Sequence, residues 1–168
     1  MAMGKLGRFI KHRLWDERDA RRALPADALT RLAERIAASE QTHSGQIRIC
    51  VEASLPLRYL RQQASARQRA LALFGKLGVW DTEHNNGVLI YLLLAEHAIE
   101  VVADRGLRAQ DGAWKPMVEQ LRTALKAGRF EEGLNGAVDA ASGVLQSEFP
   151  REAGTGRGNE LPNEVVVL

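Results

Sequence analysis

The chain has 168 residues, 45% of them hydrophobic, and a formal net charge of +2. This length and apolar content suit one globular domain and exclude a disordered or fibrous protein. The single cysteine, Cys50, excludes an internal disulfide and a cysteine-only zinc site, and it fits a reducing compartment.

Residues 1–22 carry most of the basic character, with seven Lys/Arg against three acids. The same segment contains Phe9, Ile10, Leu14 and Trp15. Two interpretations are open: a charged extension that packs loosely on the domain, which we favour, and a basic amphipathic helix that contacts an anionic membrane. No apolar run is long enough for an export signal or a membrane span. We therefore expect a cytoplasmic protein, with peripheral contact at the inner membrane face through residues 1–22 as the second interpretation.

The spacing of apolar residues predicts the regular elements in chain order. They are a helix from Pro25 to about residue 41, a strand over Ile47–Val51, a helix from about residue 57 to Leu77, strands over Val88–Leu94 and Ala98–Ala103, helices over 117–125 and 130–145, and a mobile tail over 151–168. The helix that ends at Leu77 carries five basic residues and no acid. We interpret that run as a solvated face, and because no nucleic-acid motif accompanies it, we do not expect nucleic acid as a partner.

This order predicts an α/β fold, in which a small mixed β-sheet is sandwiched between helices in a Rossmann-like α/β/α arrangement. A long helical connection joins the first two strands, so they should run parallel, and the third strand should form an antiparallel hairpin with the second. Cys50 falls on the opposite face of its strand from the isoleucines, and we expect it to be structural. The predicted organisation is a basic extension over 1–22, a domain over 23–150 and a tail over 151–168.

Counting residues outward from the hairpin turn places polar residues together at the open end of the hairpin. If the chain folds back at Glu96-His97, Asp104 lies opposite Val88 or Leu89, and the segment that starts at Asn85 lies beside it. The loop before the hairpin ends at this corner and the loop after it begins there, so residues of both loops can reach it. The residues that could gather there are Asp81, Glu83, Asn85, Asn86, Asp104 and Asp111.

Carboxylate and amide oxygens are the ligands that calcium accepts in a loose shell. One interpretation is a divalent cation site, for Ca²⁺ or Mg²⁺, with Asp81, Asn85, Asn86 and Asp104 as ligands. The alternative is that these residues only form turns and caps, which use the same residue types. We predict no catalytic residue, since no nucleophile motif is present, and the scattered histidines include only His84 next to the corner.

One stretch resembles the TPM domain family, which includes thylakoid lumen proteins of photosystem II repair and many bacterial proteins. The resemblance rests on NNGVLIYLLLAEHAIEVVADRG, which runs from Asn85 to Gly106, on LGVWDTEH before it and on GRFEEGLNGAVDA after it, and it covers roughly residues 24–149. It implies an α/β/α sandwich and two functions proposed for members, acid phosphatase activity and calcium binding. The positions that carry over are Asp81, Asn85 and Asn86-Gly87.

The chain also departs from the family pattern. Members often have aspartate where Asn85 stands, so one formal charge is missing, and Asp104 from the neighbouring strand could replace it. Two functions follow as hypotheses. The first, which we favour, is an accessory module that binds a partner protein near the membrane, with a cation ordering the loops at the hairpin. The alternative is a metal-dependent acid phosphatase, implied by the resemblance alone.

Overall fold

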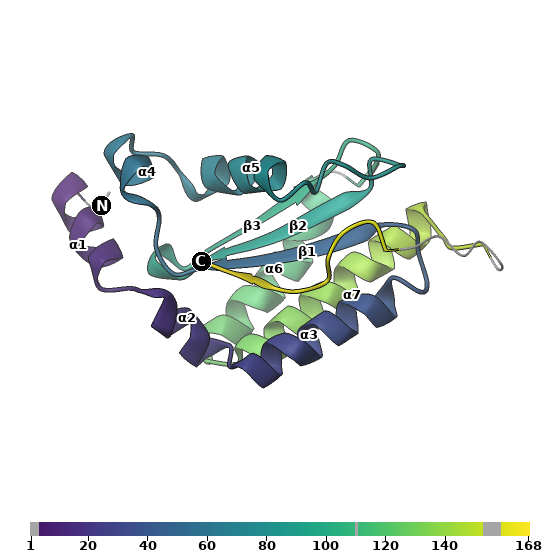
Figure 1. The fold of residues 1–168 in the computed structure, drawn as a ribbon, viewed down its shortest axis with the longest axis horizontal. Coiled ribbons are helices and arrows are strands. Elements are labelled where there is room, and N and C mark those ends of the chain that lie inside the picture. The colour runs from purple at the N-terminus through teal and green to yellow at the C-terminus, as the bar shows by residue number, and fades with distance from the viewer. Residues whose placement is uncertain (1–3, 110, 153–158) are drawn as a thin grey trace.

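The structure is a computed structural model that describes residues 4–109, 111–152 and 159–168. Within these residues the centre is a four-stranded sheet in the order β3-β2-β1-β4 (Figure 1). β1 (Gln46–Glu52) and β2 (Gly87–Leu93) pair in parallel, and β3 (Ala98–Ala103) is antiparallel to β2. The predicted mixed sheet, with its crossover and its hairpin, is confirmed.

Helices cover both faces of this sheet (Figure 1). Their bounds are α1 (Lys5–Arg13), α2 (Glu17–Ala23), α3 (Ala26–Ser39), α4 (Leu57–Arg61), α5 (Ala66–Lys76), α6 (Asp111–Lys126) and α7 (Phe130–Glu148), with a 3-10 turn, η1 (Leu94–Glu96), in the hairpin. α4 and α5 pack on one face, and α3, α6 and α7 pack on the other. The predicted α/β/α sandwich is therefore confirmed.

β1 and β2 are buried along their whole lengths because they lie at the centre of the sheet under both helical layers. Ile47 and Ile49 pack toward α3 and α7, whereas Cys50 packs toward α5. Burial raises the pKa of the Cys50 thiol to about 12, so the thiol is unreactive at neutral pH. The interpretation of Cys50 as a structural residue on the opposite face agrees with this placement.

The expected continuous helix from residue 57 to Leu77 is wrong, because the chain forms two helices there. Gln63 has a left-handed φ of 56° after α4, and Ser65 then caps α5. The Ser65 hydroxyl accepts the Gln68 N–H, and the Gln68 side chain accepts the Ser65 N–H, which is a capping box. The basic run is also not uniformly solvated, since Arg69 is 6% exposed and pairs with Glu52.

The N-terminal helices pack on the domain, contrary to the expected loose extension over residues 1–22. His12 is 3% exposed, its Nδ1 accepts the Leu55 N–H at 3.0 Å, and its Nε2 lies 2.8 Å from a Glu96 carboxylate oxygen. Ala20 in α2 is fully buried and belongs to the core cluster that includes residues of β1 and α3. These contacts join residues 5–23 to the hairpin and to the end of β1.

The C-terminal residues 159–168 also differ from expectation, because they run along the sheet instead of forming a mobile tail. β4 (Val166–Val167) pairs in parallel with β1, and Leu161 is buried. The Arg48 guanidinium donates to the carbonyls of Pro162 and Glu164. Residues 153–158 of the predicted tail lie outside the described residues.

A search of the described residues finds no helix that is both long enough and apolar enough to cross a bilayer.

Candidate functional site

The open end of the hairpin brings together the two polar segments that the sequence count placed there. The Asp104 N–H donates to the Gly87 carbonyl at 2.9 Å, and the Gly106 N–H donates to the Asn85 carbonyl at 2.8 Å. A Cβ on Gly106 would lie 2.3 Å from the His84 carbonyl oxygen, so only glycine permits this approach. The predicted neighbourhood is confirmed, although Asp104 lies opposite Gly87 instead of Val88 or Leu89.

Two side-chain oxygens in this corner are buried without a hydrogen-bond partner. Asn86 is fully buried; its N–H donates to the Thr82 hydroxyl, its amide Nδ2 donates to the Ser44 hydroxyl, and its Oδ1 has no donor. Asp104 accepts the Arg105 N–H at its Oδ1, and its Oδ2 is buried without a partner. An unpaired buried acceptor typically costs about 1–3 kcal/mol, so these two oxygens are the unsatisfied acceptors of the corner.

The other two predicted ligands are placed less favourably. Asn85 is half-buried, has a left-handed φ of 51° and uses its backbone carbonyl to hold Gly106. Asp81 is exposed in the turn after α5, where its N–H donates to the Gly78 carbonyl. Within the described residues, no group of three or more His, Cys, Asp or Glu side chains could hold a metal. The side chain of Asp111, also expected at this corner, lies outside the description.

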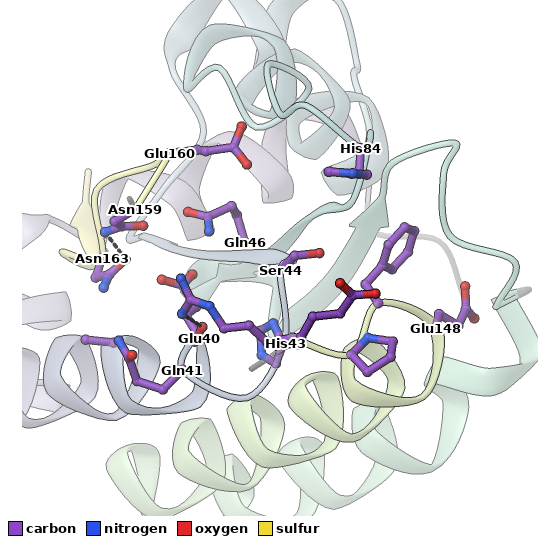
Figure 2. A pocket seen from close by; sticks show the side chains of 15 residues that line it. Glu40, Gln41, His43, Ser44, Gln46, His84, Glu148, Asn159, Glu160 and Asn163 are labelled. Atoms are coloured by element: carbon purple, nitrogen blue, oxygen red, sulfur yellow. Dashed lines mark hydrogen bonds between the residues drawn. The ribbon is translucent and has the colours of Figure 1, made fainter. Parts of the chain in front are cut away.

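A cavity of about 700 Å³ adjoins the corner (Figure 2). The end of α3, the loop into β1, the end of α7 and the start of the C-terminal segment form its walls, and His84 and Ser44 connect it to the hairpin. Its polar lining residues include Glu40, His43, Ser44, Gln46, His84, Glu148, Asn159, Glu160 and Asn163. Sequence analysis did not predict this cavity.

Burial sets the charge of two groups in the cavity wall. His43 is 1% exposed, and burial lowers its pKa to about 4, so its ring is neutral at pH 7. Its Nδ1 lies 3.1 Å from the Gly45 carbonyl, which can only accept, so the proton sits on Nδ1 and the unpartnered Nε2 is an acceptor. Glu40 accepts the Ile47 N–H, and burial raises its pKa to about 7.

These groups supply oxygen ligands and hydrogen-bond acceptors. Ser44 is engaged by the Asn86 amide, and in the part of the chain that the structure describes, no hydrogen bond joins a serine or cysteine to a histidine. The activated nucleophile of covalent hydrolysis depends on such a bond. Carboxylate and amide oxygens of this kind are ligands that hard cations accept.

One signal could have located the cavity wall from the sequence. Because β1 and β2 are parallel, the residues that precede each strand lie at the same end of the sheet. His43-Ser44-Gly45 precedes β1 just as His84-Asn85-Asn86 precedes β2. The two segments should therefore meet, and the Asn86 amide does bond to the Ser44 hydroxyl at 3.3 Å.

Residues 18–144 match the family model described as TPM domain, and this span includes β1, the β2–β3 hairpin and most of α7. The chain belongs to the TPM domain family. The resemblance carried by residues 85–106 is thus confirmed. No match was found among the curated proteins.

Two solved structures are similar to this TPM domain. One is the NMR structure of the BA42 protein from the psychrophilic bacterium Bizionia argentinensis, with 26% identity, a TM-score of 0.73, and coverage of 85% of this chain and 94% of that one. The other is the solution NMR structure of an N-terminal domain from P. gingivalis, with 22% identity, a TM-score of 0.61, and coverage of 75% and 79%. The second shows likeness of fold alone.

Proposed function

We propose that this TPM domain protein is a binding module for a partner protein, and that the open end of its hairpin takes a divalent cation. The observation that carries the proposal is the pair of buried, unpartnered oxygens, Asn86 Oδ1 and Asp104 Oδ2. The Asp104 N–H donates to the Gly87 carbonyl, and Asn86 directly precedes Gly87, so both residues lie at the open end of the hairpin. In this proposal the cation satisfies an unpartnered oxygen at the open end and holds its segment in place.

Asp104 and Asn86 are the ligands best supported, with Asn85 and the exposed Asp81 as further candidates. Calcium suits this set better than magnesium, because calcium accepts a loose shell of carbonyls and water, whereas magnesium demands near-ideal octahedral geometry. Of the two carboxylates in this set, only Asp104 has a buried oxygen, and the residue as a whole is half-buried. Since charge count tunes such sites, we expect an affinity in the weak range of about 10⁻⁴–10⁻³ M.

In this proposal the cation affects the binding of a partner through the cavity next to the corner. His84 lines the cavity and sits directly before the Asn85-Asn86 segment, and Ser44 links the cavity wall to Asn86. Ordering of this segment by a cation would therefore also order one wall of the cavity. We place the module in the cytoplasm, which the unpaired and buried Cys50 supports.

A calcium titration tests the cation site. At a tenfold excess over Kd, binding should stabilise the fold by RT ln 11, or about 1.4 kcal/mol. For a domain of this size that is a rise in melting temperature of roughly 3–6 °C. Amide shifts should concentrate at residues 84–87 and 104–107. Asp104→Asn should remove most of the response, and Asp139→Asn, which changes an exposed carboxylate on α7, should leave it intact.

One more variant, Asp81→Asn, and a phosphatase assay decide whether Asp81 is a ligand and whether the alternative function holds. Asp81→Asn should weaken the calcium response only if the exposed turn contributes to the site. Hydrolysis of an aryl phosphate should stay at background with either metal. Turnover that purifies with the protein and disappears in Asp104→Asn would instead establish a metal-dependent acid phosphatase. A melting temperature unmoved by millimolar calcium would reduce the corner to turn structure.

A further inference from the structure

α1 has two faces with different environments, and only one of them contacts the domain. On the docked face, the Arg8 guanidinium donates to a Glu96 carboxylate oxygen and to the Ala64 carbonyl, both at 2.6 Å. His12 bridges Glu96 and the Leu55 N–H, and Phe9 packs against the core under α4 and α5. These contacts hold α1 as a folded helix against the hairpin turn and the start of α4.

The opposite face of α1 exposes large apolar side chains. Leu6, Ile10 and Leu14 are 74%, 55% and 76% exposed, and their spacing of four residues places them in one row along the helix. The helix itself contains no acidic residue. Lys11 and Arg13 lie on either side of the row by helical angle, and Lys5 is in the first turn.

We propose that this outer face of α1 binds an anionic membrane surface, with Leu6, Ile10 and Leu14 entering the headgroup region and the neighbouring cations contacting lipid phosphates. Amphipathic helices bind at membrane interfaces in this manner, and the charge of the polar flanks sets their preference for anionic lipid. The proposal goes beyond the cation-binding function and does not depend on it.

The neighbouring helix α4 lies beside α1 (Figure 1) and also exposes apolar and basic side chains. Leu57 at its start is 52% exposed, and Arg58 and Arg61 are exposed beside it. α1 and α4 lie side by side, since Arg8 reaches the carbonyl of Ala64 just after α4. A second copy of the chain is a poor occupant for this surface, because two such basic faces would repel each other.

The position of α1 also determines how the protein would sit on a membrane. α1 contacts η1, the turn of the hairpin, whereas the polar corner lies at the open end. The seven residues of β2 separate the two sites by roughly 20 Å at about 3.3 Å per residue. Docking through α1 would therefore leave the polar corner and its cavity facing away from the lipid.

Sedimentation of the full chain with vesicles tests this surface. Binding should occur with vesicles that contain phosphatidylglycerol, should be weak with phosphatidylcholine alone, and should fall in about 1 M salt, where the Debye length is about 3 Å. Lys5→Gln with Lys11→Gln should reduce partitioning roughly 25-fold, or about fivefold for each cation near the surface. Leu6→Gln with Leu14→Gln should reduce it at least roughly tenfold, because the inserted apolar area is lost.

Leu71→Gln is the matched control, since Leu71 is an exposed leucine (50%) on α5 and outside this surface. The residues changed in the three variants are exposed, apart from the half-buried Lys11, so their melting temperatures should stay near that of the parent. The proposal is overturned if anionic vesicles do not bind at low salt, or if the leucine pair can be changed without loss. Binding that depends only on the lysines, and that acidic polypeptides compete away equally well, would identify an acidic protein as the occupant instead.

Discussion

Breaking the buried ion pair beneath α5 should destabilise the fold, and removing its remaining members should restore most of the lost stability. Arg69 donates to both carboxylate oxygens of Glu52, at 2.9 and 2.6 Å, and the Tyr91 hydroxyl donates to the same carboxylate at 2.7 Å. The side chains of Arg69 and Glu52 are only 7% and 3% exposed. Arg69→Met would leave a buried carboxylate with one neutral donor, and breaking such a pair typically costs 3–5 kcal/mol.

Removing the whole group should cost much less than breaking it. In Arg69→Met/Glu52→Met/Tyr91→Phe no buried charge or orphaned hydroxyl remains, and methionine conserves most of the volume. Replacement of a buried ion pair by apolar residues is often neutral or stabilising. We therefore expect the unfolding free energy of the triple variant to lie within about 1–2 kcal/mol of that of the parent. Urea denaturation followed by far-UV circular dichroism measures both values. A triple variant as unstable as Arg69→Met, or an Arg69→Met protein within about 1 kcal/mol of the parent, would contradict this reasoning.

Three further predictions concern other parts of the chain. Deletion of residues 1–20 should lower the unfolding free energy in urea by roughly 3 kcal/mol or more, because it uncovers the core around Leu24 and leaves the Leu55 N–H unpaired. An unchanged urea midpoint would show that the segment is separable from the domain. Glu40 has a folded pKa of about 7, above its ordinary value, so the contribution of its protonated form to folding stability is intact near pH 4.5 and is lost as the pH rises through 7. Glu40→Gln should therefore raise the unfolding free energy at pH 8 by up to about 3 kcal/mol, but should change it little at pH 5. Gly106→Ala should cost about 1–3 kcal/mol in thermal unfolding, because its Cβ would meet the His84 and Asn85 carbonyls, and it should also blunt the calcium response.

The hairpin shows how far local patterns reach and where they stop. Apolar runs and a short polar connection were enough to predict two antiparallel strands and the meeting of residues 85–87 with residues 104–106. The pairing is one residue off because Leu94 belongs to the η1 turn, so Leu93 is the residue opposite Ala98. A 3-10 turn and a strand end differ in backbone angles that side-chain patterns do not encode.

Several side chains have roles that only contacts distant in sequence decide. Arg69 belongs to a run of basic residues that looks uniformly solvated, yet its partner Glu52 is 17 residues away on a central strand. Glu40 and His43 follow a helix in an ordinary loop, and they become buried groups with shifted pKa values because other segments pack over them. Burial and charge pairing depend on what covers a residue, and local periodicity carries no record of that.

The sequence by itself determined the mixed sheet, the hairpin, the helical layers and the TPM resemblance, because each follows from apolar periodicity or from a contiguous motif. Only the tertiary structure decided what the two ends of the chain do. α1 is amphipathic in sequence, but its docking through Arg8 and His12 onto Glu96 leaves the Leu6 face outward. The glycine-rich composition before β4 favours a free tail, yet its last residues complete the edge of β1, where unpaired backbone groups and Arg48 offer hydrogen bonds that composition cannot reveal.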